Sequence, residues 1–389
     1  TQSRSSAASD VYKRQGTHRV EQRDRLGGHE PHRGSHAGRY GDRTAAFFVR
    51  DSCSLCADAK AKESENRGIW RLNAALRKLV LAINQLFLTP NRARLHAILR
   101  TVQASGVQNL RTDRPERTTV EIRKRNNVHV IDAIRPDVPV LVYAHGFGCS
   151  QHMWRHITPA FEGKCHQVLF DYVGCGQSDL AAFDPVKYAS LKGYVQDLLD
   201  VCDALGIERG VHFVGHSVSA SIGLLASIER PMLFDRLILV GPSPCYINHA
   251  PDYLGGFERQ DLEGLLDLMD QNFMGWSSYL APIVAGAPQA DSLGGELSES
   301  FCSTDPTMAR IFAQATFFAD TREELSRVTR PSLILQHGND ALAPHSVGEY
   351  MHKKLRDSTL EVLDVTGHCA HMSHPHLVTA AMQRYLSLA

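Results

Sequence analysis

Ser217 is the residue whose type and surroundings point most directly to chemistry. An apolar run at 211–214 leads into the sequence Gly-His-Ser-Val-Ser at 215–219, and small residues continue from Ala220. A serine between small residues, at a turn from a strand into a helix, is typical of a nucleophile elbow, where bulkier neighbours would clash. Ser219 stands where the general pattern has glycine, which is a mild departure. We predict that Ser217 presents its hydroxyl for attack on a carbonyl carbon.

A glycine-rich turn at 145–148 fits the same reaction. The sequence His-Gly-Phe-Gly follows the apolar run Val138–Ala144, about 70 residues before Ser217. An oxyanion hole needs two backbone N–H groups aimed at one point, and glycines let the backbone approach a substrate closely. We expect the N–H groups of Phe147 and Val218 to hold the oxyanion.

The general base and its orienting acid follow later in the chain, in the order Ser, Asp, His that such a site uses. Asp340 and His368 each come shortly after an apolar, strand-like run. A carboxylate on a loop at the end of a strand can orient the imidazole of a histidine. Asp320 and Asp364 are rival acids, but they fit the edge of a helical insertion and the end of a strand better. We predict a triad of Ser217, Asp340 and His368.

Histidines are frequent near the predicted base, which raises the question of a metal site. No set of carboxylates or cysteines completes a ligand group there, and the pair Cys53-x-x-Cys56 has no second pair or histidine spacing to complete one. We predict neither a metal nor a cofactor. The nearby histidines are His352, His371, His374 and His376; of these, His371 and His374 are expected to pack on the following helix, and His145, His212 and His216 are likewise expected to be structural.

From Asn126 onward, short apolar runs alternate with helical stretches. Strands that alternate with helices indicate a mostly parallel sheet covered by helices on both faces, and with the elbow they predict an α/β-hydrolase fold. The predicted strands are Val138–Ala144, Gln167–Phe170, Val211–Val214, Leu237–Val240, Ser332–Gln336 and Thr359–Leu363, and the main predicted helices are Leu191–Leu205 and Ala220–Ser227.

The interval 246–328 is helical, rich in aromatic residues and without a clear strand. Such an insertion between sheet strands is most simply a cap over the active site. We expect some of its aromatic side chains to line a closed apolar pocket over Ser217, although all of them could instead attach the cap to the sheet. The predicted pocket residues are Phe147, Phe273, Trp276 and Phe317.

The 389-residue chain divides by composition and charge. Residues 1–125 hold 25 basic and 12 acidic side chains, whereas residues 126–389 hold 17 basic and 30 acidic ones. Residues 1–66 have few large apolar side chains, so we expect a disordered or artefactual segment. For residues 67–122 we predict a basic helical extension. The helical periodicity at 69–88 fits a helix that packs on the folded domain, or one that binds a membrane surface or a partner. Residues 123–389 form the predicted hydrolase domain.

Composition also excludes several classes of protein. The acidic second part argues against nucleic-acid binding by the folded domain. No apolar stretch is long enough to span a membrane, and no secretory signal is visible. The nine cysteines are odd in number and irregularly spaced, which indicates reduced thiols and a cytoplasmic protein.

Five motifs strongly resemble the bacterial RsbQ hydrolases, which are positive regulators of the sigma-B energy-stress response. More distantly, the chain is similar to the plant strigolactone and karrikin receptor hydrolases. The resemblance runs from about Arg123 to the C-terminus. The motifs are Gly-His-Ser-Val-Ser-Ala at 215–220, Gly-Pro-Ser-Pro-Cys-Tyr at 241–246, Gly-Gly-Phe-Glu at 255–258, Phe-Cys-Ser-Thr-Asp-Pro at 301–306 and Gly-His-Cys at 367–369.

The resemblance implies the same triad, Ser217, Asp340 and His368, and the same oxyanion donors, Phe147 and Val218. It also implies a protein partner, an RsbP-like phosphatase with a sensor domain, and a role in stress-response signalling. We expect hydrolysis of a small hydrophobic ester, lactone or related carbonyl compound. The alternatives are a ligand sensor with little turnover, a general carboxylesterase, and a cofactor-free haloperoxidase, dehalogenase or carbon–carbon hydrolase; a dehalogenase would carry Asp in place of Ser217.

Overall fold

The computed structural model describes residues 116–286 and 292–388. The predicted N-terminal segment 1–66, the pair Cys53 and Cys56, and the predicted helix at 69–88 lie outside the described residues. Of the predicted extension 67–122, the structure describes the part within helix α4 (Glu116–Arg125). The boundary predicted at 123 falls inside this helix, whose Arg125 Nη2 donates to Asp200 Oδ2 at 3.0 Å. The end of α4 is therefore anchored on the domain that follows it.

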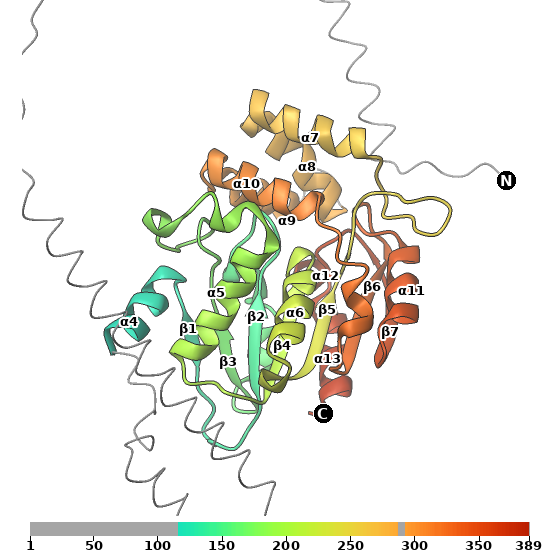
Figure 1. Cartoon of the computed structure of the whole chain (residues 1–389). Helices are drawn as coiled ribbons and strands as arrows, with labels where there is room; N and C mark the ends of the chain where they lie inside the picture. The colour runs from blue at the N-terminus through green and yellow to red at the C-terminus, as the bar shows by residue number, and fades with distance from the viewer. Residues whose placement is uncertain (1–115, 287–291, 389) are drawn as a thin grey trace, which may run out of the picture. The chain divides into compact units, whose positions relative to one another are not determined.

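A seven-stranded sheet forms the centre of the described part, in the spatial order β1-β3-β2-β4-β5-β6-β7 (Figure 1). β1 runs antiparallel to β3, and each other neighbouring pair is parallel. The predicted fold class, a mostly parallel sheet covered by helices and carrying a helical insertion, is confirmed. The strands are β1 (His129–Ile131), β2 (Val140–Ala144), β3 (His166–Leu169), β4 (Val211–His216), β5 (Phe234–Val240), β6 (Ser332–Asn339) and β7 (Ser358–Thr366).

The central strands are continuous apolar runs because both of their faces are covered. All six residues of β4 are buried, and β2 and β5 are buried over most of their length. Parallel strands end at the same edge of the sheet, and the register pairs Ala144 with Gly215 and His216 with Val240. The residues that follow β2, β4, β6 and β7 therefore meet above this edge.

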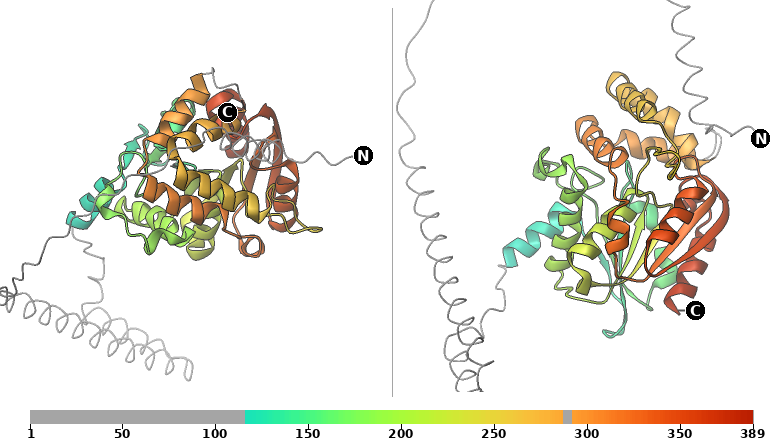
Figure 2. Two further views of the ribbon diagram at one scale, coloured as in Figure 1. Left: turned by 90° about the horizontal axis from the view of Figure 1, so that it is seen from above. Right: turned by 45° about the vertical axis from the view of Figure 1, so that its right-hand side comes forward.

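Helices flank the sheet, with α5 and α6 on one face of the central strands and α13 on the other (Figures 1 and 2). The helices after α4 are α5 (Leu191–Ala204), α6 (Val218–Glu229), α7 (Arg259–Gln271), α8 (Phe273–Ala285), α9 (Ser292–Cys302), α10 (Pro306–Phe317), α11 (His345–Lys354), α12 (Ala370–Ser373) and α13 (Pro375–Leu386). Short 3₁₀ helices lie at Gln151–Trp154, Thr158–Phe161, Leu180–Ala182, Lys187–Ala189, Pro231–Leu233 and Glu324–Arg327.

Helices α7 to α10 form a layer of their own above the ends of the strands (Figure 1). They lie between β5 and β6 in the chain, within the interval 246–328. α7 is amphipathic and buries Leu262, Leu265, Leu266 and Met269, whereas α8 is apolar on most sides. Because this layer has its own buried apolar residues, it can cover the sheet edge as a unit.

Strand β1 was not predicted, and several predicted boundaries are off by one to three residues. β1 is three residues long, too short for the alternation that identifies a strand in a sequence. The last strand, β7, runs on to Thr366 and so includes Asp364.

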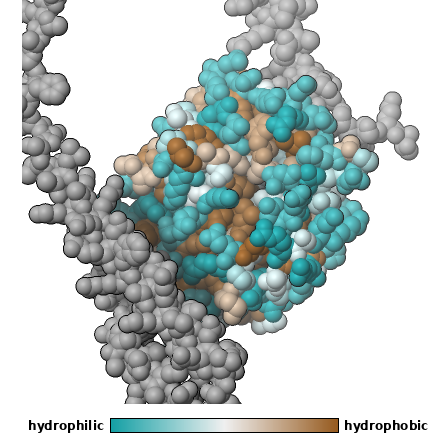
Figure 3. Space-filling view, viewed as in Figure 1, coloured by the Kyte–Doolittle hydropathy of each residue, from teal (hydrophilic) through white to brown (hydrophobic). Residues whose placement is uncertain are grey.

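The face of the described part seen in Figure 3 is mixed rather than apolar. Hydrophobic atoms lie in separate patches among hydrophilic ones on the face in Figure 3. No helix among the described residues is long and apolar enough to cross a membrane. The described cysteines are all free; Cys302 is half-buried and the others, Cys149, Cys165, Cys175, Cys202, Cys245 and Cys369, are buried.

Candidate active site

Ser217 lies at a sharp turn between β4 and α6, as the elbow pattern predicts. Its backbone has φ 57° and ψ −122°, a conformation that costs energy in a non-glycine residue and is held by the surrounding structure. Its N–H donates to Val240 O at 2.9 Å. A Cβ on Gly215 would lie 2.7 Å from Ser219 O, so this position requires glycine. The turn places the Ser217 hydroxyl at the N-terminus of α6, where the helix dipole favours negative charge.

Ser219 suits the elbow although the general pattern has glycine there. Its hydroxyl is fully buried, donates to His145 O at 2.5 Å and lies 3.1 Å from Tyr172 Oη. The side chain therefore connects the elbow to the glycine-rich turn after β2.

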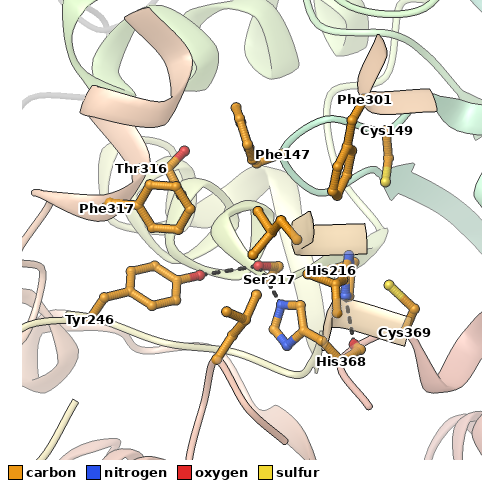
Figure 4. Close-up of a pocket in the computed structure, with 13 residues that line it drawn as sticks. Phe147, Cys149, His216, Ser217, Tyr246, Phe301, Thr316, Phe317, His368 and Cys369 are labelled. Atoms are coloured by element: carbon orange, nitrogen blue, oxygen red, sulfur yellow. Dashed lines mark hydrogen bonds between the residues drawn. The ribbon is translucent and has the colours of Figure 1, made fainter. Parts of the chain in front are cut away.

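A continuous relay of hydrogen bonds joins Ser217, His368 and Asp340. His368 Nε2 lies 2.7 Å from Ser217 Oγ, and His368 Nδ1 lies 2.7 Å from Asp340 Oδ2 (Figure 4 shows the first of these contacts). An ionised carboxylate only accepts hydrogen bonds, so Nδ1 carries the proton and Nε2 is free to accept the serine proton. This arrangement can convert the hydroxyl of Ser217 into a nucleophile.

The carboxylate of Asp340 is buried and accepts several hydrogen bonds. The N–H groups of Leu342 and Ala343 donate to its Oδ1 at 2.8 and 3.2 Å. Burial acts to raise the pKa of Asp340, but the neighbouring His368 and His337 outweigh burial and hold that pKa well below its ordinary value. The carboxylate is therefore ionised and fixed in orientation at neutral pH.

The rival acids lie elsewhere. Asp320 is 41% exposed and pairs with Arg322, and Asp364 lies within β7. Neither has a described contact with His368.

His337 is a second histidine on the same carboxylate, which the sequence analysis missed. It lies in β6, is fully buried, and its Nδ1 is 3.3 Å from Asp340 Oδ2, a long contact for a hydrogen bond. Its sequence position, three residues before Asp340, was the available signal. Because His368 already binds the same oxygen, His337 acts on Asp340 rather than on Ser217.

We expect His337→Gln to lower kcat by up to about tenfold with little change in KM, because this long contact to a charged acceptor is worth at most about the 1.5 kcal/mol of a full hydrogen bond. Steady-state kinetics on a chromogenic ester measures this. His212→Gln is the matched control, since His212 is a buried histidine on β4, which β5 separates from β6, and it does not contact Asp340. Equal kcat values in the two variants would show that His337 does not position the acid.

The loop that carries His368 is also tied to the cap. The N–H of His368 donates to Val284 O near the end of α8 at 2.7 Å, and the N–H of Gly367 donates to Asn339 O at 2.9 Å. His216 Nε2 lies 2.9 Å from His368 O. Burial, with nearby His371 and His368, lowers the pKa of His216 well below its ordinary value, so His216 is neutral. The position of His368 thus depends on both the sheet and the cap.

The predicted oxyanion donors lie next to the serine in the structure. Phe147 lies in the cavity wall over Ser217, in the turn that follows β2. Gly148 has φ 70°, and a Cβ there would lie 2.4 Å from the ring of Phe301, so the turn requires glycine. Val218 is the first residue of α6, and the first N–H groups of a helix have no acceptor within the helix. Both N–H groups stay predicted donors.

Tyr246 is a site residue that the sequence analysis did not assign, although it lies in the Gly-Pro-Ser-Pro-Cys-Tyr motif. Its hydroxyl is 3.1 Å from Ser217 Oγ (Figure 4). Since the one serine proton points to His368, Tyr246 is the donor in this contact. Burial raises the pKa of Tyr246 to about 12, so the phenol stays protonated.

The cavity over Ser217 is small and mainly apolar. Its volume is about 20 Å³, room for about one water molecule. It is lined by Phe147, Cys149, His216, Ser217, Tyr246, Leu280, Val284, Phe301, Thr316, Phe317, Leu342, His368 and Cys369.

Two of the four predicted pocket residues, Phe147 and Phe317, line this cavity. Trp276 is not in the lining but packs behind it, with its ring centre 6.0 Å from that of Phe147. Phe273 stacks on Trp276 at 5.6 Å and is also outside the lining. Phe301 lines the cavity where Phe273 and Trp276 were expected, because α9 rather than the start of α8 faces Ser217.

The other histidines predicted to be structural lie in the turn, the strand, the elbow and the C-terminal helices. His145 Nε2 accepts from Tyr172 N at 3.1 Å, and His371 is fully buried against His216 and Trp154. Two groups among the described residues bring metal-binding atoms together: His337, Asp340 and His368, and, away from the serine, Cys245, His249 and Asp320. The first group is occupied by the hydrogen bonds described above.

The fold and this relay define a class of hydrolase, and sequence comparison gives the same class. Residues 141–381 match the model of the alpha/beta hydrolase family. The chain belongs to this family.

Several relatives show which branch of the family is similar. The chain is 40% identical over 248 residues to a probable esterase of Oryza sativa subsp. japonica, covering 64% of this chain and 91% of that protein. It is 38% identical over 248 residues to a strigolactone esterase of Arabidopsis thaliana, covering 64% and 92%. The solved structure of a hydrolase from Oleispira antarctica has 43% identity and a TM-score of 0.67, covering 69% of this chain and 97% of that one. The chain is thus an esterase-like hydrolase related to strigolactone and karrikin receptor hydrolases.

Proposed function

We propose that this protein is a serine hydrolase of small hydrophobic esters, lactones or related carbonyl compounds, with Ser217, His368 and Asp340 as its catalytic triad. The observation that carries the proposal is the relay of two 2.7 Å contacts from Ser217 through His368 to Asp340. Asp340 supports the proposal because it is ionised and accepts hydrogen bonds on both oxygens. Such a carboxylate holds the imidazole of His368 in the tautomer that accepts the serine proton.

The first half of the reaction forms an acyl-enzyme. Ser217 Oγ attacks the carbonyl carbon while its proton passes to His368 Nε2, and Asp340 stabilises the imidazolium that results. The N–H groups of Phe147 and Val218 are the proposed donors to the oxyanion, which forms at the N-terminus of α6. Collapse of the tetrahedral intermediate breaks the ester bond, and His368 gives its proton to the leaving alkoxide.

The second half of the reaction hydrolyses the acyl-enzyme and regenerates the free Ser217 hydroxyl. A water gives its proton to His368 Nε2 and attacks the acyl carbon, the acid leaves, and Ser217 regains its proton. Tyr246 is placed to donate to Ser217 Oγ in the resting state, so it must release this contact or share it as the oxygen bonds to carbon. Besides the ester and this water, the proposed reaction uses side chains and backbone groups of the site.

The substrate class follows from the cavity. A volume of about 20 Å³ over Ser217, walled by Phe147, Phe301 and Phe317, leaves no room for a long acyl chain without movement of the cap. An apolar lining with few polar groups selects compact hydrophobic ligands. Two relatives are named as esterases, which agrees with this class.

We expect activity on nitrophenyl esters to fall by about tenfold or more once the acyl chain exceeds a few carbons, because each misfitted methylene costs about 1–3 kcal/mol. A series from acetate to octanoate measures this. Phe317→Ala should shift the optimum to longer chains, whereas Phe318→Ala, the neighbouring residue outside the lining, should leave the series unchanged. Rising activity on long-chain esters in the wild type would overturn the enclosed site.

We further propose an RsbQ-like role in stress-response signalling, in which the site reports on a small hydrophobic ligand to a protein partner such as an RsbP-like phosphatase with a sensor domain. Two features support it: the RsbQ-type motifs, and the bond from His368 N to Val284 O, which links the base to the cap. A ligand at Ser217 can therefore alter the cap surface.

A signalling hydrolase should release product slowly. We expect a pre-steady-state burst of about one product per protein, followed by slow turnover as the acyl-enzyme persists. Stopped-flow absorbance with a chromogenic ester measures both phases. Fast linear turnover without a burst would favour the alternative, a general carboxylesterase without a signalling role.

A further inference from the structure

The two chain segments that join the cap to the sheet meet at Cys245 and Asp320. These residues form an antiparallel bridge, and Thr321 N donates to Pro244 O at 2.8 Å. His249 lies on the same side, held by paired backbone hydrogen bonds of 2.8 and 3.0 Å with Tyr253. Hydrogen bonds within the chain therefore fix the backbone at all three residues independently of any ligand.

Their donor atoms converge on one point. A sulfur, an imidazole nitrogen and a carboxylate oxygen from Cys245, His249 and Asp320 all lie within 4.8 Å of one another. Cys245 Sγ is 3.7 Å from His249 Nε2, and His249 Nε2 is 3.9 Å from Asp320 Oδ2. The contact between Cys245 Sγ and His249 Nε2 is a weak hydrogen bond to sulfur, whereas the separation of Nε2 and Oδ2 exceeds that of an ordinary N–H···O hydrogen bond.

The same distances suit a shared ion. A tetrahedral Zn²⁺ with bonds of about 2.3 Å to sulfur and about 2.0 Å to nitrogen and oxygen separates its S and N ligands by about 3.6 Å and its N and O ligands by about 3.3 Å. The observed S–N separation is longer by about 0.1 Å and the N–O separation by about 0.6 Å, so rotation of the exposed His249 and Asp320 side chains would close the site. The donor set of thiolate, imidazole and carboxylate is one that borderline divalent ions prefer.

We propose that Cys245, His249 and Asp320 form a binding site for Zn²⁺ or a similar borderline divalent ion, which fastens the two connections between sheet and cap. Cys245 closes the inner side of the site, because it is 1% exposed. The side chains of His249 and Asp320 are 44% and 41% exposed, so the outer side is open to the ion and to a water as fourth ligand.

The charges at the site are compatible with this occupant. Arg322 binds Asp320 through Nε at 2.8 Å and Nη2 at 2.6 Å, and it fixes the carboxylate as an outer partner of a metal ligand does. Partial burial acts to raise the pKa of Asp320, and the bonds from Arg322 lower it further than burial raises it, so the carboxylate is ionised. Burial raises the pKa of the Cys245 thiol. Binding therefore forms a metal–sulfur bond and releases the thiol proton to water.

Cobalt(II) is the probe, because cobalt bound to a thiolate absorbs in the near ultraviolet by charge transfer and cobalt bound to other groups does not. The experiment titrates Co²⁺ into the full chain carrying Cys53→Ser and Cys56→Ser, which removes the closely spaced cysteine pair from the competition for the ion. We expect one equivalent to bind with a charge-transfer band, Zn²⁺ to displace it, and the thermal transition to rise with added Zn²⁺.

Two variants in this background test the ligands Cys245 and His249, and a third serves as the control. Cys245→Ser should abolish the band, and His249→Asn, an exposed change that leaves the core intact, should weaken affinity at least tenfold, since even an outer partner is worth about 10–100-fold. Cys302→Ser, a half-buried thiol on α9, should bind as the background does. The proposal is overturned if no charge-transfer band forms, or if the band persists in Cys245→Ser or keeps its affinity in His249→Asn.

Discussion

Ser217→Ala should abolish hydrolysis of a simple ester such as nitrophenyl acetate. The change removes the Oγ atom that lies 2.7 Å from His368 Nε2, and loss of a triad nucleophile costs on the order of 10⁴–10⁶ in kcat. Steady-state kinetics measures the loss, and circular dichroism and thermal unfolding report whether the variant is folded. The elbow itself should persist, because its geometry depends on Gly215 and the Val240 contact rather than on the hydroxyl.

Ser221→Ala is the matched control for this prediction. Ser221 is a buried serine one turn further along α6, and its hydroxyl donates to Ser243 O at 3.0 Å, away from His368. The control should keep activity within about tenfold of the wild type. If Ser217→Ala also kept activity within tenfold, the assignment of Ser217 as nucleophile would fail.

Asp340→Asn should lower kcat about 10⁴-fold while the geometry of the loop is kept. An asparagine can still accept from Leu342 N and Ala343 N, but its amide group does not hold His368 in the tautomer that accepts the serine proton. The matched control is Asp364→Asn, which changes the rival carboxylate in β7. Equal losses in the two variants, or none in Asp340→Asn, would remove Asp340 from the relay.

The same variant gives a prediction for stability in acid. Because His368 and His337 outweigh burial and lower the pKa of Asp340 below its unfolded value of about 4, the ionised carboxylate stabilises the fold above that pH, and this stability is lost as pH falls through the folded pKa. Asp340→Asn lacks this dependence. Urea unfolding at a series of pH values should show the difference in free energy of unfolding between wild type and variant narrowing below about pH 4. A constant difference would mean that the carboxylate is not stabilised by its neighbours.

The place where the candidate triad meets was largely predictable because each of its three residues lies just beyond a strand. Ser217, Asp340 and His368 follow β4, β6 and β7, and a parallel sheet brings those strand ends to one edge. Apolar runs in the sequence indicate the buried strands and where they end. The meeting of the three residues at the carboxyl edge of the sheet could therefore be inferred without coordinates.

The other residues of the site could not be predicted, because their positions depend on tertiary contacts that no local sequence pattern indicates. His337 reads as an ordinary strand residue, and its place beside Asp340 depends on how β6 ends. Tyr246, in the connection after β5, and Phe301, in α9, line the cavity over Ser217, but helical periodicity does not predict this packing. Phe273 and Trp276 are also aromatic, yet they pack one layer behind the lining. Aromatic content predicts a lined cavity but not which rings face it.

The most direct test of the account is to trap the acyl-enzyme. The full chain is mixed with a slowly deacylating ester, quenched in acid and analysed by intact-protein mass spectrometry, followed by sequencing of the modified peptide. The account predicts one acyl group per protein, located on Ser217 and absent from Ser217→Ala but present in Ser221→Ala. An acyl group on another residue, or turnover with equal labelling in Ser217→Ala, would contradict the proposal that Ser217 is the nucleophile.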